Sequence, residues 1–142
     1  MSRFSPSGIS LHHTASHHAT WALFAFPVLG CGFVALHAFF ALGIAQMGGT
    51  IILGDSARPG QPAYDYADAH FPKHLFGFVT GYPLVLVACC GLILAATGLA
   101  TYRNWIPAML LLFAAAAMPW IPAITFLFRL LSLAGQSPST PA

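Results

Sequence analysis

The stretch Ala63-Tyr64-Asp65-Tyr66-Ala67-Asp68-Ala69-His70-Phe71-Pro72-Lys73-His74 lies between two long apolar runs and divides the chain. It holds two of the three acidic residues and two of the seven histidines. An apolar run of about 20 residues can cross a bilayer as a helix, whereas a segment with this many polar side chains stays in water. The stretch therefore separates the first predicted membrane span from the second. It is also where we expect any chemistry or docking surface that faces water.

Composition places most of the chain in lipid. Of the 142 residues, 58% are hydrophobic and only 6% are charged. A soluble domain carries about 25% charged residues, because water must be met by polar groups. The formal net charge of +2 is small and spread along the chain, whereas nucleic-acid binding needs clustered lysine and arginine. The composition indicates a membrane protein and excludes nucleic acid as a main partner.

Hydropathy along the chain predicts an all-α integral membrane protein with three transmembrane helices in one membrane domain (21–134). The predicted spans cover residues 21–47, 74–100 and 106–133. The other segments are a polar, histidine-rich N-terminal arm (1–20), an exposed loop (about 48–73) and a short disordered tail (135–142). The first span is too long for the apolar part of a cleaved signal peptide, so we expect it to be retained.

Small residues predict the face on which the second span packs. Gly77 and Gly81 are four residues apart, and this spacing makes a flat groove that lets another helix come close. Gly91, Ala95 and Gly98 continue the small-residue spacing further along the same span. These five residues form the predicted helix-packing face.

Prolines predict interruptions in two spans. Pro83 is expected to kink the second span near its start, and Pro119 and Pro122 lie in the middle of the third. A backbone carbonyl that loses its donor to proline must find another partner in lipid, usually on a neighbouring helix. The third span is therefore expected to be broken at 118–122 and to pack against other helices there.

The three cysteines, Cys31, Cys89 and Cys90, all lie inside apolar runs. Disulfide frameworks and zinc sites need spaced cysteines near water. The pattern is typical of small apolar packing residues.

The N-terminal arm contains the first candidate metal site, the histidines His12, His13, His17 and His18. On a helix, His13 and His17 share a face at a spacing that two ligands of one metal can use. A stable site usually needs three or four ligands, and no cysteine or carboxylate is near in sequence. The alternative is a polar arm whose histidines carry a pH-dependent charge near the lipid head groups.

The polar stretch contains the second candidate metal site, made of Asp65, Asp68, His70 and His74. Mixtures of aspartate and histidine suit zinc, copper, manganese or non-haem iron. If the region were helical, His70 and His74 would lie one turn apart, but Pro72 falls between them and strains a continuous helix. The alternative is a water-facing loop in which a lysine balances the aspartates.

His37 is the only ionisable group in the middle of the first predicted span, and a residue of this kind is a functional candidate by default. It could bind a haem or a chlorophyll-type pigment, meet a quinone oxygen, or make a hydrogen bond to a neighbouring helix. A haem held between His37 and His74 of the same chain is not expected. His37 lies about 15 Å below the surface at which His74 enters, whereas two axial nitrogens are about 4 Å apart.

No nucleophile–base pair, phosphate-binding loop or dinucleotide-binding glycine pattern occurs in the sequence, so we expect no enzyme activity from this chain alone. The leading hypothesis is an accessory subunit of a larger energy-converting membrane complex. Its partners would be other integral membrane subunits and the lipid bilayer, and the aromatic residues Tyr64, Tyr66 and Phe71 would dock on a neighbour.

A haem- or pigment-binding anchor that uses His37 is the alternative function, and metal handling by the histidine and aspartate clusters is a weaker one. The expected location is a bacterial inner membrane or an organellar membrane. The count of positive charges does not decide the orientation, since Arg3 and Arg103 lie on one side and Arg58, Lys73 and Arg129 on the other. Arg103, in the short connector between the second and third spans, favours a cytoplasmic N-terminus.

Overall fold

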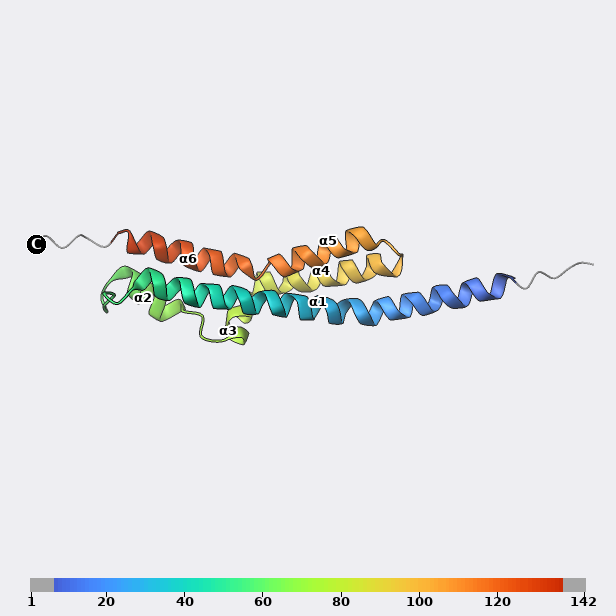
Figure 1. Ribbon diagram of the computed structural model, residues 1–142, viewed down its shortest axis with the longest axis horizontal. Coiled ribbons are helices and arrows are strands. Elements are labelled where there is room, and N and C mark those ends of the chain that lie inside the picture. The colour runs from blue at the N-terminus through green and yellow to red at the C-terminus, as the bar shows by residue number, and fades with distance from the viewer. Residues whose placement is uncertain (1–6, 137–142) are drawn as a thin grey trace, which may run out of the picture.

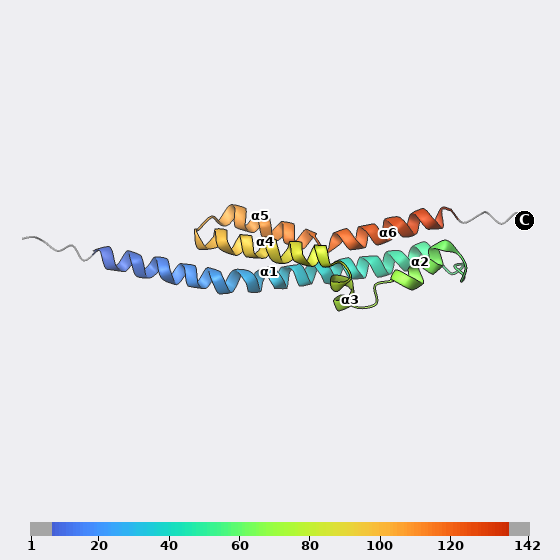
Figure 2. The ribbon, with the colours of Figure 1, turned by 180° about the vertical axis from the view of Figure 1, so that it is seen from behind.

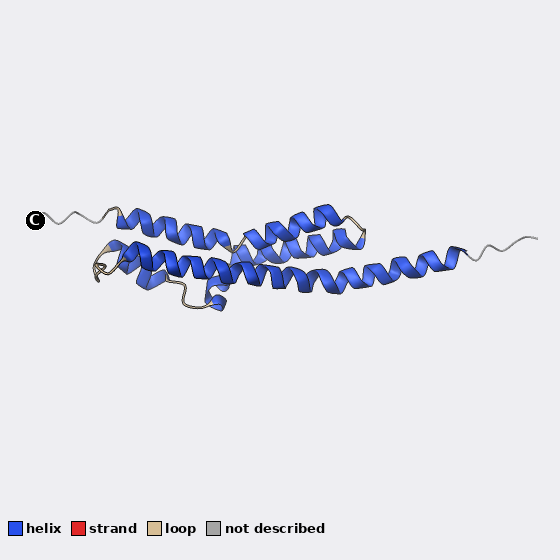
Figure 3. Cartoon of the chain, viewed as in Figure 1, coloured by secondary structure: helices blue, strands red, loops and turns tan. Residues whose placement is uncertain are grey.

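The structure is a computed structural model that describes the backbone of residues 7–136 and the side chains of residues 17–136. Over this part of the chain the secondary structure consists of helices joined by short turns (Figure 3). The helices are α1 (Ser7–Leu53), α2 (Pro62–His70), α3 (Leu75–Thr80), α4 (Pro83–Thr101), α5 (Trp105–Ala117) and α6 (Trp120–Ala134).

Three helical segments are long and apolar enough to cross a membrane: His17–Leu53, Pro83–Thr101 and Trp105–Ala134. This confirms the predicted class, an all-helical protein with three candidate transmembrane helices. The second of these segments starts nine residues later than predicted, and the other two extend beyond their predicted limits.

The first helix is longer than predicted. α1 contains 47 residues, which corresponds to about 70 Å at 1.5 Å per residue. It includes part of the predicted arm and the start of the predicted loop, and Pro27 lies inside it without ending it. Gly54 ends the helix with a positive φ of 61°, and its N–H donates to Thr50 O at 3.0 Å. The helix extends beyond the predicted span of 21–47, because hydropathy marks contact with lipid and not the length of a helix.

Proline divides the second predicted span. Gly81 and Tyr82 separate α3 from α4, and Pro83 begins α4 at a position where the missing N–H costs nothing. Only α4 is long enough to cross a bilayer.

Proline also interrupts the third span, as expected. Pro119 has no N–H to donate to Ala115 O, and the chain turns at Met118 and Pro119 between α5 and α6. Ala115 O instead accepts the Met118 N–H at 3.2 Å and the thiol of buried Cys89 at 3.5 Å. The carbonyl freed by proline is thus satisfied by a neighbouring helix, and Cys89 does more than fill space.

The predicted loop contains a helix. α2 begins with Pro62, and its residues Ala63 and Ala67 are buried against the rest of the protein. The turn before it is held by the Gly60 N–H, which donates to Asp65 Oδ1 at 3.0 Å. The alternation of charged and aromatic residues concealed this helix, because its buried face consists only of alanines.

All other described helices contact α1, at two levels along its length (Figures 1 and 2). The hairpin of α4 and α5 packs against the middle of α1, beyond which the N-terminal turns of α1 extend, whereas α2, α3 and α6 pack against its C-terminal part. We call the first level the hairpin tier; its buried residues are Ala22, Phe26, Ile93, Ala96, Ala100, Ala108, Leu112 and Ala115. We call the second level the cap tier; its buried residues are Ala41, Leu42, Ala45, Ala63, Ala67, Phe78, Ala123, Phe126 and Leu130.

Alanine pairs bring the helices together. The pairs Ala41/Ala45 in α1, Ala63/Ala67 in α2 and Ala96/Ala100 in α4 are each four residues apart and buried. Small residues at this spacing let helix backbones approach closely, and dispersion contacts then accumulate along the interface. The packing motif of this chain is therefore alanine-based.

The predicted packing face of the second span is not used inside the chain. Gly91, Ala95 and Gly98 are exposed, and a Cβ added at Gly91 or Gly98 would meet nothing within 4 Å. A Cβ at Gly77 would meet the His74 ring, and one at Gly81 would meet Gly77 O at 2.9 Å, so these glycines accommodate local groups and not a second helix.

The closest approach of helices in the hairpin tier occurs at Gly30 of α1. A Cβ there would lie 3.0 Å from the Ile93 side chain and 3.1 Å from that of Leu112. Gly30 therefore fixes the distance between α1 and the hairpin.

We expect Gly30→Leu to lower the free energy of unfolding by about 1–3 kcal/mol, because the added side chain overpacks the hairpin tier. Gly91→Leu is the matched control and should change it by about 0.5 kcal/mol or less, because that position is open. Denaturant unfolding of the purified chain in detergent, followed by circular dichroism, measures both. Equal effects would show that the α1–α4 contact is not as described.

Candidate functional site

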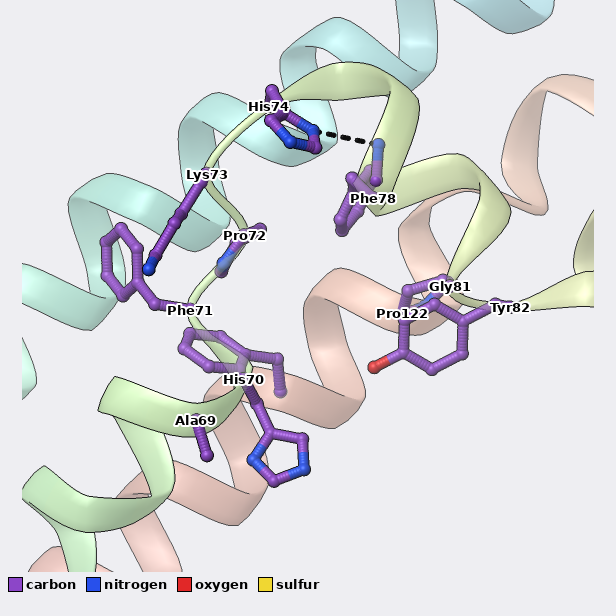
Figure 4. A pocket seen from close by; sticks show the side chains of 12 residues that line it. Ala69, His70, Phe71, Pro72, Lys73, His74, Phe78, Gly81, Tyr82 and Pro122 are labelled. Carbon is purple, nitrogen blue, oxygen red and sulfur yellow. Dashed lines mark hydrogen bonds between the residues drawn. The ribbon is translucent and has the colours of Figure 1, made fainter.

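A cavity of about 380 Å³ lies in the cap tier, between the end of α2, the connector 71–74, α3 and the start of α6 (Figure 4). Its size falls within the range of small-molecule pockets. Its polar lining comes from His70, Lys73, His74 and Tyr82, and its apolar lining includes Phe78, Pro122 and Phe126. It brings together residues from both ends of the predicted polar stretch.

Gln46 of α1 holds the connector in place. Its side-chain Nε2 donates to Pro72 O at 2.8 Å, and Pro72 itself is buried. The sequence analysis missed Gln46. The signal was present, since an amide inside an apolar run must find a hydrogen-bond partner.

His70 and His74 line the cavity but do not lie one turn apart on a helix. α2 ends at His70, and His74 is the N-cap of α3. His70 Nδ1 lies 3.0 Å from Tyr66 O, and because a carbonyl can only accept, this nitrogen carries the proton. His74 Nδ1 instead accepts the Gly77 N–H at 3.0 Å, so its proton is on Nε2. Both imidazoles therefore offer Nε2 to the cavity, as an acceptor in His70 and as a donor in His74.

Tyr82 is the hydrogen-bond donor on the α4 side. Figure 4 shows its ring reaching back from the start of α4, with the hydroxyl directed toward the side formed by α2. Burial raises the pKa of the Tyr82 phenol, and the nearby phenol of Tyr66 raises it further. The hydroxyl therefore keeps its proton, and its ability to donate, throughout the neutral pH range.

Aromatic rings build the wall between α2 and α6. Tyr66 stacks on His70 with ring centroids 4.5 Å apart and on Phe126 at 5.9 Å, and Phe71 meets Phe126 edge-on at 6.1 Å. Tyr66 and Phe71 were expected to dock on another protein. Both are half-buried, and their rings contact aromatic residues of their own chain.

The structure does not bring the predicted metal ligands together. Among the described residues no three histidine, cysteine or acidic side chains lie close enough to hold a metal ion. Asp65 accepts the Gly60 N–H, and Asp68 lines a different hollow, next to Tyr64. His74 Nε2 carries a proton and cannot act as a ligand in this state.

The histidine arm lies partly outside the described side chains, which exclude His12 and His13. Of the other two, His17 is exposed. His18 lies with its Nε2 3.3 Å from Ala100 O, and its ring meets Trp105 edge-on at 5.2 Å. His18 thus ties α1 to the connector between α4 and α5.

His37 makes a hydrogen bond between helices. The indole N–H of Trp120 donates to His37 Nδ1 at 3.1 Å, and the ring of Phe33 packs edge-on against the imidazole at 4.8 Å. Because an indole N–H can only donate, Nδ1 has no proton and Nε2–H does. This arrangement corresponds to the hydrogen-bonded packing histidine that the sequence left as an alternative.

The same hydrogen bond opposes a haem or pigment at His37. A histidine that binds a metal through one ring nitrogen usually donates the other ring N–H to an acceptor. Here Nδ1 accepts from Trp120, so the lone pair of Nε2 is not free for a metal. The residues around His37 do not fit an axial ligand site.

No protein-family model, curated protein or solved structure matches the chain. The class that the fold defines, a helical protein with three helices able to span a membrane, is therefore established from the chain itself.

We expect Gln46→Leu to destabilise the protein by about 1–3 kcal/mol, because Pro72 O would be left without a donor in a buried place. Unfolding in detergent measures this cost. Thr50→Val is the control, since Thr50 donates only to Met47 O of its own helix at an exposed position. A loss in Gln46→Leu no larger than in Thr50→Val would contradict a role for Gln46 in holding the connector.

We expect His37→Ala and Trp120→Phe to be coupled, because each variant removes one side of the same hydrogen bond. A double-mutant cycle should give a coupling energy of about 0.5–2 kcal/mol, the range found for hydrogen bonds between membrane helices. The cycle requires the unfolding free energies of both single variants and the double variant. Additive effects would show that the two side chains do not interact.

Proposed function

We propose that this protein is a non-catalytic accessory subunit of a larger membrane complex. The observation that carries the proposal is an apolar surface that extends along α1 beyond the thickness of one bilayer. We infer the position of the bilayer from the charges and from the register of the helices.

The hairpin tier matches the hydrocarbon layer of a bilayer. α4 has 19 residues and a length of about 28 Å, close to the ~30 Å of the layer. No charged residue occurs in α4, and Arg103 and Trp105 follow its end, where interfacial residues belong. The His18–Ala100 contact aligns this end with the N-terminal part of α1.

The C-terminal part of α1 then projects from the bilayer. Starting from His18, the ~30 Å layer takes up about 20 residues of α1 and ends near His37. His37 therefore lies near an edge of the layer and not at its centre. The remaining residues of α1, down to Leu53, reach about 24 Å further, together with α2 and the C-terminal part of α6. The first turns of α6 stay in the layer, because the 13 residues of α5 cover only about 20 Å of it.

The projecting cap exposes large apolar side chains that lipid does not cover. Phe76 is 79% exposed, Phe128 75% and Ile51 74%. Further exposed residues of this cap apolar surface are Ile44, Met47 and Leu131. Apolar residues at this density outside lipid are typical of a surface that binds another protein.

Small residues on α4 provide a second contact within the membrane. Gly91, Ala95 and Gly98 face away from the other helices of the chain. A transmembrane helix of a partner could pack closely on this face, as small-residue motifs allow. The predicted helix-packing face would thus serve contacts between subunits.

We further propose a bacterial inner membrane or an organellar membrane, with the N-terminus in the cytoplasm or its organellar equivalent and an energy-converting complex as the partner. Arg103 in the short connector supports this orientation, because positive charges stay on the cytoplasmic side. A phosphatase fused after Ala142 should then be active on the far side of a bacterial inner membrane. An inactive phosphatase, with an active cytoplasmic reporter at the same point, would reverse the orientation.

The decisive experiment is the native mass of the tagged protein extracted in a mild detergent. We expect an assembly larger than the 15.0 kDa chain, with other membrane subunits in fixed stoichiometry. A lone chain or an assembly of identical copies would overturn the proposal.

Substitutions in the cap should separate association from folding. We expect Ile51→Asn with Phe128→Asn to release the co-purifying subunits while the isolated chain keeps its helical content, because both side chains are exposed. Asp68→Asn changes an exposed cap residue outside the apolar surface and is the control. If the double variant still co-purified with its partners, the cap apolar surface would not be part of the interface.

A further inference from the structure

With the bilayer placed as in the proposed function, on which this inference rests, the cavity in the cap tier lies next to the edge of the membrane. Tyr82 lines it, and the next residue begins α4, the helix that matches the hydrocarbon layer. Leu84 and Val87, in the first turns of α4, are exposed and apolar. A ligand in this cavity would therefore have water on one side and lipid on the other.

Three of the four polar side chains that line the cavity are donors: Tyr82, Lys73 and His74. Within the described residues neither the Tyr82 hydroxyl nor the Lys73 ammonium makes a hydrogen bond. His74 adds Nε2–H, because its Nδ1 is occupied by the Gly77 N–H. His70 differs from these three, because its Nδ1–H is bonded to Tyr66 O and its Nε2 is an acceptor. No aspartate or glutamate is among the described residues that line the cavity.

Donors with a lysine and without a carboxylate select an anion. A cation would meet Lys73 and the proton on His74 Nε2, and a neutral carbonyl would leave most of the donors unused. A phosphate has several strong acceptor oxygens and can accept from more than one of these groups. Lys73 stands at the rim, with its ammonium beside the Phe71 ring (Figure 4), and its flexible stem lets it turn toward an anion.

The remaining walls suit an apolar tail. Phe78, Phe126 and Pro122 form the apolar side of the cavity, and both phenylalanines are buried. A chain leaving the cavity along α4 would pass Leu84 and Val87 and enter the hydrocarbon layer. Free phosphate would use only the polar half of such a site.

We propose that the cavity between α2, α3, α4 and α6 binds the phosphate head group of an anionic phospholipid. The head group accepts hydrogen bonds from Tyr82 and His74 and is neutralised by Lys73. Basic pockets between helices at the membrane surface are a common way to hold such lipids. The binding uses a single chain, so it does not depend on a partner subunit.

The test is lipid titration of the delipidated full-length chain in a neutral detergent, read by native mass spectrometry. We expect dioleoyl phosphatidylglycerol to bind more tightly than dioleoyl phosphatidylcholine. The double variant Lys73→Gln/Tyr82→Phe should lose about tenfold or more in affinity for phosphatidylglycerol, because charge-assisted hydrogen bonds are removed. Both positions are exposed, and circular dichroism without lipid checks that the variant folds.

Arg58→Gln is the matched control, since Arg58 is a cation of the same cap that does not line the cavity. It should leave the affinity unchanged, and Lys73→Arg should retain binding. Equal affinities of the double variant and the wild type would overturn the site, as would an equal loss in Arg58→Gln. Displacement of the lipid by an equal concentration of inorganic phosphate would overturn a lipid as the source of the anion.

Discussion

The rest of the structure depends on the length of α1. A helix satisfies its backbone hydrogen bonds internally, so it can pass from water through lipid and out again without interruption. α1 runs without interruption over 47 residues with Pro27 inside it, and every other described helix touches it. Because the other helices are shorter, they must be arranged along α1 in succession. The two tiers follow from this difference in length.

The breaks at proline allow the shorter helices to pack along α1 at two levels. The turn at Met118 and Pro119 passes the chain from the hairpin tier to the cap tier, and Cys89 satisfies the carbonyl that the turn leaves free. The break at Gly81 and Tyr82 likewise passes the chain from the cap tier, which contains α3, to the hairpin tier, which contains α4. Both breaks lie near the level of the His37–Trp120 hydrogen bond, which joins α1 to the first turn of α6. The boundary between the tiers thus has a hydrogen bond between helices, whereas the buried clusters of the two tiers are apolar.

The sequence predicted the class, the number of spans and the break at Pro119, because each depends on local chemistry: apolar length, and the donor that proline lacks. It did not predict which face of a span packs. In a soluble helix the polar side marks the exterior, but α4 is apolar all round, so nothing in its pattern separates lipid from protein. The prediction based on Gly91 and Gly98 therefore chose the outward face of α4. The buried face, which contains Ala96 and Ala100, was not predicted.

The cavity was only partly predictable for a related reason. His70 and His74 were singled out because they are polar among apolar neighbours, and they do line it. Tyr82 joins them from the far side of α3, and Gln46 fixes the connector from α1, 26 residues before Pro72. Such pairings arise from tertiary structure, and hydropathy along a single chain contains no record of them. The roles of the two histidine rings follow only from the atoms next to them.

The arrangement along α1 also has a consequence for the order of folding. The cap cluster joins Ala41 and Ala45 of α1 to Ala123, Phe126 and Leu130 of α6, about 80 residues later in synthesis. α1 and the α4–α5 hairpin can associate as soon as α5 has emerged, whereas the C-terminal half of α1 has to wait for α6. Contacts between distant segments form slowly, and an apolar surface that waits is prone to wrong associations. The cap tier is therefore the last part of the protein to mature, and it is the part whose assembly a chaperone or an early-bound partner would protect.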